Sequence, residues 1–191
     1  MKKIIALVLS IIVCLSLVAC GNNDTAPVET TAPAANASAD ITPDVDADSV
    51  GGQHWAKFVS ELEANPAATA DELANALVSL EINQFMGMAM PMEVGAEYFP
   101  GFDNYVIEGY EACANFMPMI GSIAYVGYIF DLADDADVEA FAKNLTDNCN
   151  PRWNICVAAD QTVVGSKGST VFFLMCPATY EMGGEDAGMA L

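Results

Sequence analysis

Three segments of the chain repeat apolar residues with the spacing of an amphipathic helix. The segments 54–62, 69–80 and 134–148 each place four apolar side chains at positions i, i+3, i+4 and i+7. Residues with this spacing share one face of a helix, so each segment is predicted to be helical. Thr69 and Glu72 fit a capping box at the start of the second helix.

Acidic residues precede the third predicted helix. Asp134 or Asp135 is the expected N-cap, because a short carboxylate side chain can accept a hydrogen bond from a free backbone N–H of the first turn. Glu139 and Lys143 are four residues apart, and we expect them to pair on the helix surface. His54 is expected at the start of the first helix, directly after two glycines.

Four other segments have the composition of β-strands. The runs 122–132 and 169–176 are apolar on both faces, which is typical of central strands covered on two sides. The stretch 162–173 is predicted to be a hairpin with its turn at 165–168, and 153–159 is predicted to be a further strand. The expected fold is therefore α+β, with a small, mostly antiparallel sheet packed with about three helices.

The N-terminus has the pattern of an export signal. Lys2 and Lys3 precede an apolar run over 4–18, which is shorter than the ~20 residues of a spanning helix. The sequence Leu17-Val18-Ala19-Cys20 follows and resembles the lipobox of bacterial lipoproteins. An ordinary secretory signal with an incidental Cys20 is the alternative.

The lipobox resemblance implies a location. In that family the thiol at the position of Cys20 receives diacylglycerol, and the chain is cut before it. The protein is then expected on the outer face of the bacterial cytoplasmic membrane, or on the outer membrane of a two-membrane bacterium. Several acyl chains on one residue give a stable anchor, because each buried methylene contributes ~0.8 kcal/mol.

Composition divides the rest of the chain. Residues 1–19 form the predicted signal peptide, and 20–50 form a tether rich in Ala, Thr, Pro and Asp that is expected to be disordered. A single domain is expected over 51–180, followed by a flexible tail at 181–191. Within the tether, Asp44, Asp46 and Asp48 have the spacing of a calcium loop but lack its glycine and closing glutamate, so a solvated acidic segment is expected.

The net charge excludes one class of partner. The formal charge is −20, and removal of Lys2 and Lys3 with the signal makes it −22. Nucleic acid binding needs a basic surface, so nucleic acid is not an expected partner. The acidity suits a soluble exterior that can attract cations or basic partners.

The segment 98–180 resembles small uncharacterised lipoproteins of Gram-positive gut anaerobes. The resemblance rests on "FMPMIGSIAYVGYIFDL", "DDADVEAFAKNL", "NPRWNICVAAD" and "VFFLMCP". It supports the location and the fold class and implies no chemistry.

Catalytic motifs are absent from the sequence. His54 is the only histidine, and the chain has neither a G-x-S-x-G nor a C-x-x-C motif. The carboxylate pairs Glu93 with Glu97, and Glu108 with Glu111, lie near aromatic residues and leave a small cell-envelope hydrolase as an alternative. We nevertheless expect a protein that is not an enzyme and uses no cofactor.

Four cysteines follow the predicted anchor. They permit two disulfides, and Cys149 with Cys156 is a possible pair because both flank the same turn. The alternative is that all of them, including Cys113 and Cys176, are free thiols that pack as small apolar residues.

Methionines occupy alternate positions from Met86 to Met92, and a second cluster contains Met117 and Met119. In an extended chain alternate residues share one face, so the sulfurs of Met86, Met88 and Met90 are candidate ligands for Cu(I). The favoured interpretation is an apolar connector packed into the core, with Pro91 interrupting the strand. An exposed methionine-rich interaction surface is a third possibility.

A cluster of aromatic residues follows the methionines. Tyr98, Phe99, Phe102 and Tyr105 are expected to form an exposed binding surface. The leading hypothesis is a lipid-anchored, non-enzymatic binding module whose partner is a protein, an envelope polymer or a small ligand. The alternatives are a lipoprotein that handles Cu(I) and a hydrolase.

Overall fold

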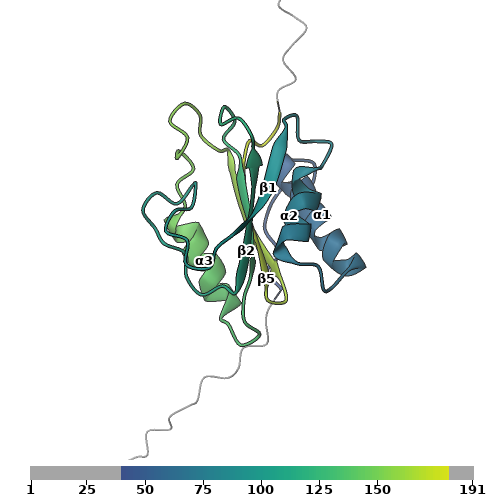
Figure 1. The fold of residues 1–191 in the computed structure, drawn as a ribbon. Coiled ribbons are helices and arrows are strands. Elements are labelled where there is room, and N and C mark those ends of the chain that lie inside the picture. Colours follow the sequence, from purple (N-terminus) through teal and green to yellow (C-terminus); the bar gives the residue numbers. More distant parts are fainter. Residues whose placement is uncertain (1–39, 181–191) are drawn as a thin grey trace, which may run out of the picture. The chain divides into compact units, whose positions relative to one another are not determined.

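A five-stranded antiparallel sheet forms the centre of the fold in this computed structural model, which describes residues 40–180. The strands lie in the order β1-β2-β3-β5-β4, so β1 and β4 are the edges. Helices α1 and α2 cover one face and α3 lies on the other (Figure 1), which confirms the α+β prediction. The elements are α1 (Val50–Ala64), α2 (Ala70–Val78), β1 (Gly87–Met92), β2 (Ala112–Pro118), β3 (Val126–Asp131), α3 (Val138–Asn148), β4 (Gln161–Lys167) and β5 (Thr170–Cys176).

The two central strands are buried on both faces. In β3, Ile129 packs with α1 and α2, whereas its neighbours Tyr128 and Phe130 pack toward α3. In β5, Phe172 and Phe173 divide between the two faces in the same way. This arrangement explains why both strands are apolar at successive positions in the sequence.

The helix starts follow the chemistry of their caps. Ser49 accepts a hydrogen bond from Gly52 N, so α1 begins four residues before His54. The capping box between Thr69 and Glu72 is present. The N-cap of α3 is Asp137, which accepts from Ala140 N at 3.0 Å, so the prediction of Asp134 or Asp135 is wrong.

The surface pair on α3 also differs from the prediction. Lys143 forms its ion pair with Asp147 instead of Glu139. Both Asp147 and Glu139 are four residues from Lys143, so the sequence spacing allows either pair.

The packed part of the chain includes residues that the sequence analysis assigned to the tether. Ile41 and Ser166 exchange two backbone hydrogen bonds of 3.2 and 2.9 Å, which places residue 41 beside the edge strand β4. Asp40 bonds Lys167 Nζ at 2.8 Å and accepts from Gly168 N at 3.0 Å. Residues 40–50 therefore belong to the domain, and Cys20, residues 21–39 and the tail at 181–191 lie outside the described residues.

Two β predictions need correction. The hairpin exists, but Gly165 lies within β4 and the turn is at Gly168 and Ser169. The segment 153–159 is an irregular loop instead of a strand, held by turns such as Val157 N to Asn154 O at 3.2 Å. The Asn154 side chain donates to Gly121 O at 2.8 Å, which fixes this loop beside the 119–124 loop.

Antiparallel pairing gives the sheet two distinct ends. One end holds the β4–β5 turn and Asp40, where the described chain begins. The opposite end holds the start of β1, the end of β2 and the last described residue, Tyr180, whose ring contacts Phe85. Within residues 40–180, no helix has both the length and the apolar character needed to cross a bilayer.

Candidate functional site

The two methionine clusters of the sequence lie side by side on β1 and β2. Met88 stands opposite Met117 in the antiparallel register. Met119 N donates to Met86 O at 2.9 Å, so this next pair continues the same ladder. Directly opposite residues in an antiparallel sheet point to the same face. We call Met86, Met88, Met117 and Met119 the thioether square.

The methionine alternation persists through Pro91. Hydrogen-bonded and non-bonded pairs alternate along an antiparallel ladder. Since Met86 and Met119 form a bonded pair, Pro91 falls at a non-bonded position, where its nitrogen faces away from β2. β1 is an edge strand, so the missing N–H costs no ladder bond.

The methionines are exposed, and the prediction that they pack into the core is wrong. The exposed fractions are 78% for Met86, 36% for Met88, 42% for Met90 and 58% for Met119. Of the methionines on β1, only Met92, at the far end of the strand, packs against the core, and Met117 on β2 is half-buried. The small residues between them, Gly87 and Ala89, face α2 instead.

The thiol beside the methionine face, that of Cys113, is not poised as a ligand. Cys113, opposite Met92, is buried, and burial together with the nearby Asp131 carboxylate raises the pKa of its thiol far above the ordinary range. Cys149 and Cys156, the possible disulfide pair, are both free thiols in the structure, as the alternative of unpaired cysteines predicted.

The predicted aromatic binding surface is largely core. Phe99 and Phe102 are fully buried, where they anchor the 93–111 loop against Tyr128 on the α3 face. Tyr105 is half-buried beside them, and only Tyr98 is well exposed. The aromatic residues therefore serve mainly to hold the loop, and the prediction of a surface is wrong for Phe99 and Phe102.

Exposed apolar side chains gather at the end of the sheet opposite Asp40. We call this surface the apolar end. A hollow of about 490 Å³ there is lined by eight residues, including Met86, Met119 and Ile120. A neighbouring hollow shares Gln84, Ser122 and Ile123 with the first and is also lined by Val157. The apolar end consists of Met86, Met119, Ile120, Ile155 and Val157. Ile155, at 97% exposed, lies in the loop that the sequence analysis assigned to a strand, so its exposure had no signal in the sequence.

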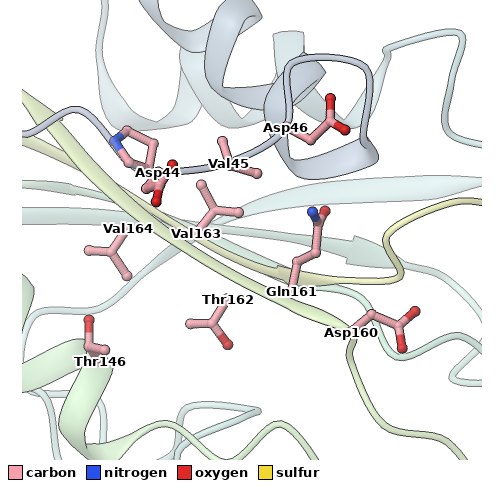
Figure 2. A pocket seen from close by; sticks show the side chains of 10 residues that line it. Asp44, Val45, Asp46, Thr146, Asp160, Gln161, Thr162, Val163 and Val164 are labelled. Atoms are coloured by element: carbon pink, nitrogen blue, oxygen red, sulfur yellow. The ribbon is translucent and has the colours of Figure 1, made fainter.

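A polar hollow of about 450 Å³ lies along the edge of β4 (Figure 2). Ile41 pairs with Ser166 of β4, and the next hydrogen-bonded pair in this antiparallel register would join residue 43 to Val164. Residue 43 is a proline, which has no N–H to donate, so the pairing stops and leaves the hollow open. Asp46 and Asp160 line the hollow, and they accept hydrogen bonds from Asp48 N and Ala178 N. These carboxylates hold the local backbone.

His54 is a buried structural residue. Its Nδ1 lies 2.7 Å from Val50 O and its Nε2 lies 2.8 Å from the Tyr125 hydroxyl. Burial lowers the pKa of His54, so the ring is neutral at pH 7. Because no part of the ring is exposed, His54 is closed to a substrate in this conformation.

The carboxylate pairs proposed for a hydrolase stand apart from the hollows. Glu93, Glu97, Glu108 and Glu111 are all exposed, and none of them lines a hollow described above. Across residues 40–180, no group of three or more His, Cys, Asp or Glu side chains is arranged to hold a metal ion. Among these described residues, the acidic triplet Asp44, Asp46 and Asp48 therefore does not form such a group.

No protein-family model, curated protein or solved structure matches this chain.

Proposed function

We propose that this protein is a lipid-anchored binding protein on the outer face of the bacterial cytoplasmic membrane, and that its apolar end docks a partner protein of the cell envelope. The anchor is the lipid on Cys20, as the lipobox implies. The docking surface is the apolar end. No catalytic step is included in this proposal.

The single observation that carries the proposal is the position of the apolar end. Residue 40, toward the predicted anchor, is bonded at the β4–β5 turn, whereas Ile120 and Ile155 project from the opposite end of the sheet. A domain tethered at one end leaves its other end free to contact proteins of the envelope. Exposed apolar side chains that lie together are typical of interaction sites.

The form of the surface favours a protein partner over a small ligand. A small ligand is usually held in a cavity that covers most of its surface. Here Ile120 and Ile155 are 74% and 97% exposed beside shallow hollows, so they resemble side chains that insert into pockets of a partner.

Site-specific crosslinking tests the docking proposal. A photoreactive residue at position 120 in the full, membrane-anchored chain is expected to give a defined crosslinked protein, and Ile155→Asp in the same chain should abolish it. Val94 is the matched control, because it is 65% exposed but lies in the 93–111 loop, toward the other end of the sheet. An identical crosslinking pattern from positions 94 and 120 would overturn the assignment of the apolar end.

The anchor is tested separately. Cys20→Ser should leave the folded domain intact and release the protein from the membrane fraction or block removal of the signal. Unchanged retention of a processed protein would contradict lipid anchoring and leave the docking result unaffected.

A further inference from the structure

We infer that the thioether square, Met86, Met88, Met117 and Met119, binds a soft monovalent cation, Cu(I) or its analogue Ag(I). The four residues belong to two sequence clusters that the β1–β2 pairing brings together. The thioether square shares Met86 and Met119 with the apolar end, whereas Met88 and Met117 lie outside it. Substitutions at Met88 and Met117 therefore test the ion site separately from protein docking.

The backbone spacing suits convergence of the sulfurs. Cα atoms of a hydrogen-bonded antiparallel pair are about 5.5 Å apart. Alternate residues along a strand are about 6.6 Å apart. The four side chains thus rise from the corners of a small rectangle on one face. Methionine has three rotatable side-chain bonds, which allow the sulfurs to cross such gaps toward a common point.

The available ligands select the class of metal. Residues 86–92 and 113–119 contain no Asp, Glu or His, so the face has no donor that hard cations prefer. Thioethers are soft ligands that favour Cu(I). The one polar side chain on this face, Asn115, is buried and donates from its amide to Gly127 O at 3.1 Å. Cys113, the only thiol of the two strands, lies beyond Met90 at the covered end of the ladder.

Accessibility and charge also support binding. Three of the four methionines are more than a third exposed, so an ion can reach the sulfurs without opening the core. The thioethers are neutral, and the bound ion keeps its positive charge. A chain with a formal charge of −20 raises the local concentration of cations near its surface.

Thioether ligation has a distinctive pH response. Cysteine and histidine sites lose affinity in acid, because protons compete for their ligands. A methionine sulfur carries no such proton. Binding at the thioether square should therefore be the same at pH 7.5 and pH 5.5, which separates it from binding at Cys149 or Cys156.

The test observes the methionines directly. The full chain is solubilised in detergent, its accessible thiols are alkylated, its methionine methyl groups are labelled with ¹³C, and Ag(I) is added. The methyl resonances of Met86, Met88, Met117 and Met119 are expected to shift and to saturate near one equivalent, at both pH values. The buried Met175 is an internal control, and its resonance should not move.

Paired substitution completes the test. Met88→Leu with Met117→Leu preserves the apolar character of the face and should weaken Ag(I) binding by at least about tenfold, since even outer-shell changes cost that much. Met175→Leu removes one sulfur elsewhere and should leave binding unchanged. The inference is overturned if no methyl resonance shifts, if all exposed methionines shift without saturation, or if the double variant binds as tightly as the original chain.

Discussion

The buried hydrogen bond between His54 and Tyr125 leads to a specific stability prediction. A carbonyl oxygen only accepts hydrogen bonds, so the contact with Val50 O places the proton on His54 Nδ1. Nε2 is then an acceptor, and the Tyr125 hydroxyl donates to it. Tyr125→Phe removes the hydroxyl donor, so His54 Nε2 stays buried without its hydrogen bond from Tyr125. The Asn83 side chain also interacts with this pair, but its amide already donates to the carbonyls of Leu77 and Val78.

The expected loss follows from the burial of the pair. Both rings are at most 1% exposed, so water cannot replace the missing donor. An unsatisfied buried polar group costs about 1–3 kcal/mol, and we expect the free energy of unfolding to fall by about 2 kcal/mol. For a domain of this size, that corresponds to a melting temperature lower by about 8 °C.

Urea unfolding followed by tryptophan fluorescence measures this loss. Trp55 and His54 both belong to α1, and Trp55 packs against Phe58 of α1 and Phe172 of β5, so its emission reports on the region around His54. Tyr98→Phe is the control, because that tyrosine is 66% exposed and its variant should stay within about 0.5 kcal/mol of the original. A Tyr125→Phe variant as stable as the Tyr98→Phe control would refute the reasoning.

Two further predictions concern pH and packing. Burial lowers the pKa of His54, so the unfolded chain takes up a proton near pH 6.5 that the folded chain excludes. The stability that His54 contributes is therefore complete above about pH 6.5 and declines below it by up to about 1.4 kcal/mol per pH unit, until the pH reaches the lowered pKa. Urea unfolding at pH 7.5 and 5.5 measures this slope, and an unchanged slope in His54→Gln would contradict the assignment, because His54 is the only histidine. Gly127→Ala should cost about 1–3 kcal/mol, since its Cβ would lie 2.1 Å from Phe116 Cζ. Gly121→Ala has no heavy atom within 4 Å of its Cβ and should be nearly neutral in the same melt.

Local patterns in the sequence predict the helices and the central strands, because each of those elements buries a regular apolar face. They do not fix the cap of α3, since Asp134, Asp135 and Asp137 are chemically equivalent candidates. Only Asp137 is placed where its carboxylate accepts from Ala140 N. The strand composition of 153–159 also misleads, because side-chain bonds such as that from Asn154 to Gly121 O hold this segment in a loop.

Strands β1 and β2 depend on partners far along the chain. Their sequences combine alanine, methionine and proline, and neither has the β-branched character that predicts a strand from sequence alone. The pairing of Met88 with Met117 spans a loop that is itself fixed by the burial of Phe99 and Phe102. The sequence therefore shows two methionine clusters, and only the tertiary register makes them neighbours.

The small residues between the methionines explain which face the sulfurs occupy. A Cβ on Gly87 would lie 2.2 Å from Val78 Cγ2, so α2 approaches β1 too closely for any larger side chain at that position. Ala89 packs toward the same helix. Gly87 and Ala89 therefore occupy the face of β1 that packs tightly against α2, and the methionines that alternate with them occupy the opposite face. Because the 93–111 loop covers only the Met92 end of that other face, the thioether square stays accessible, and the proposed ion site depends on this incomplete cover.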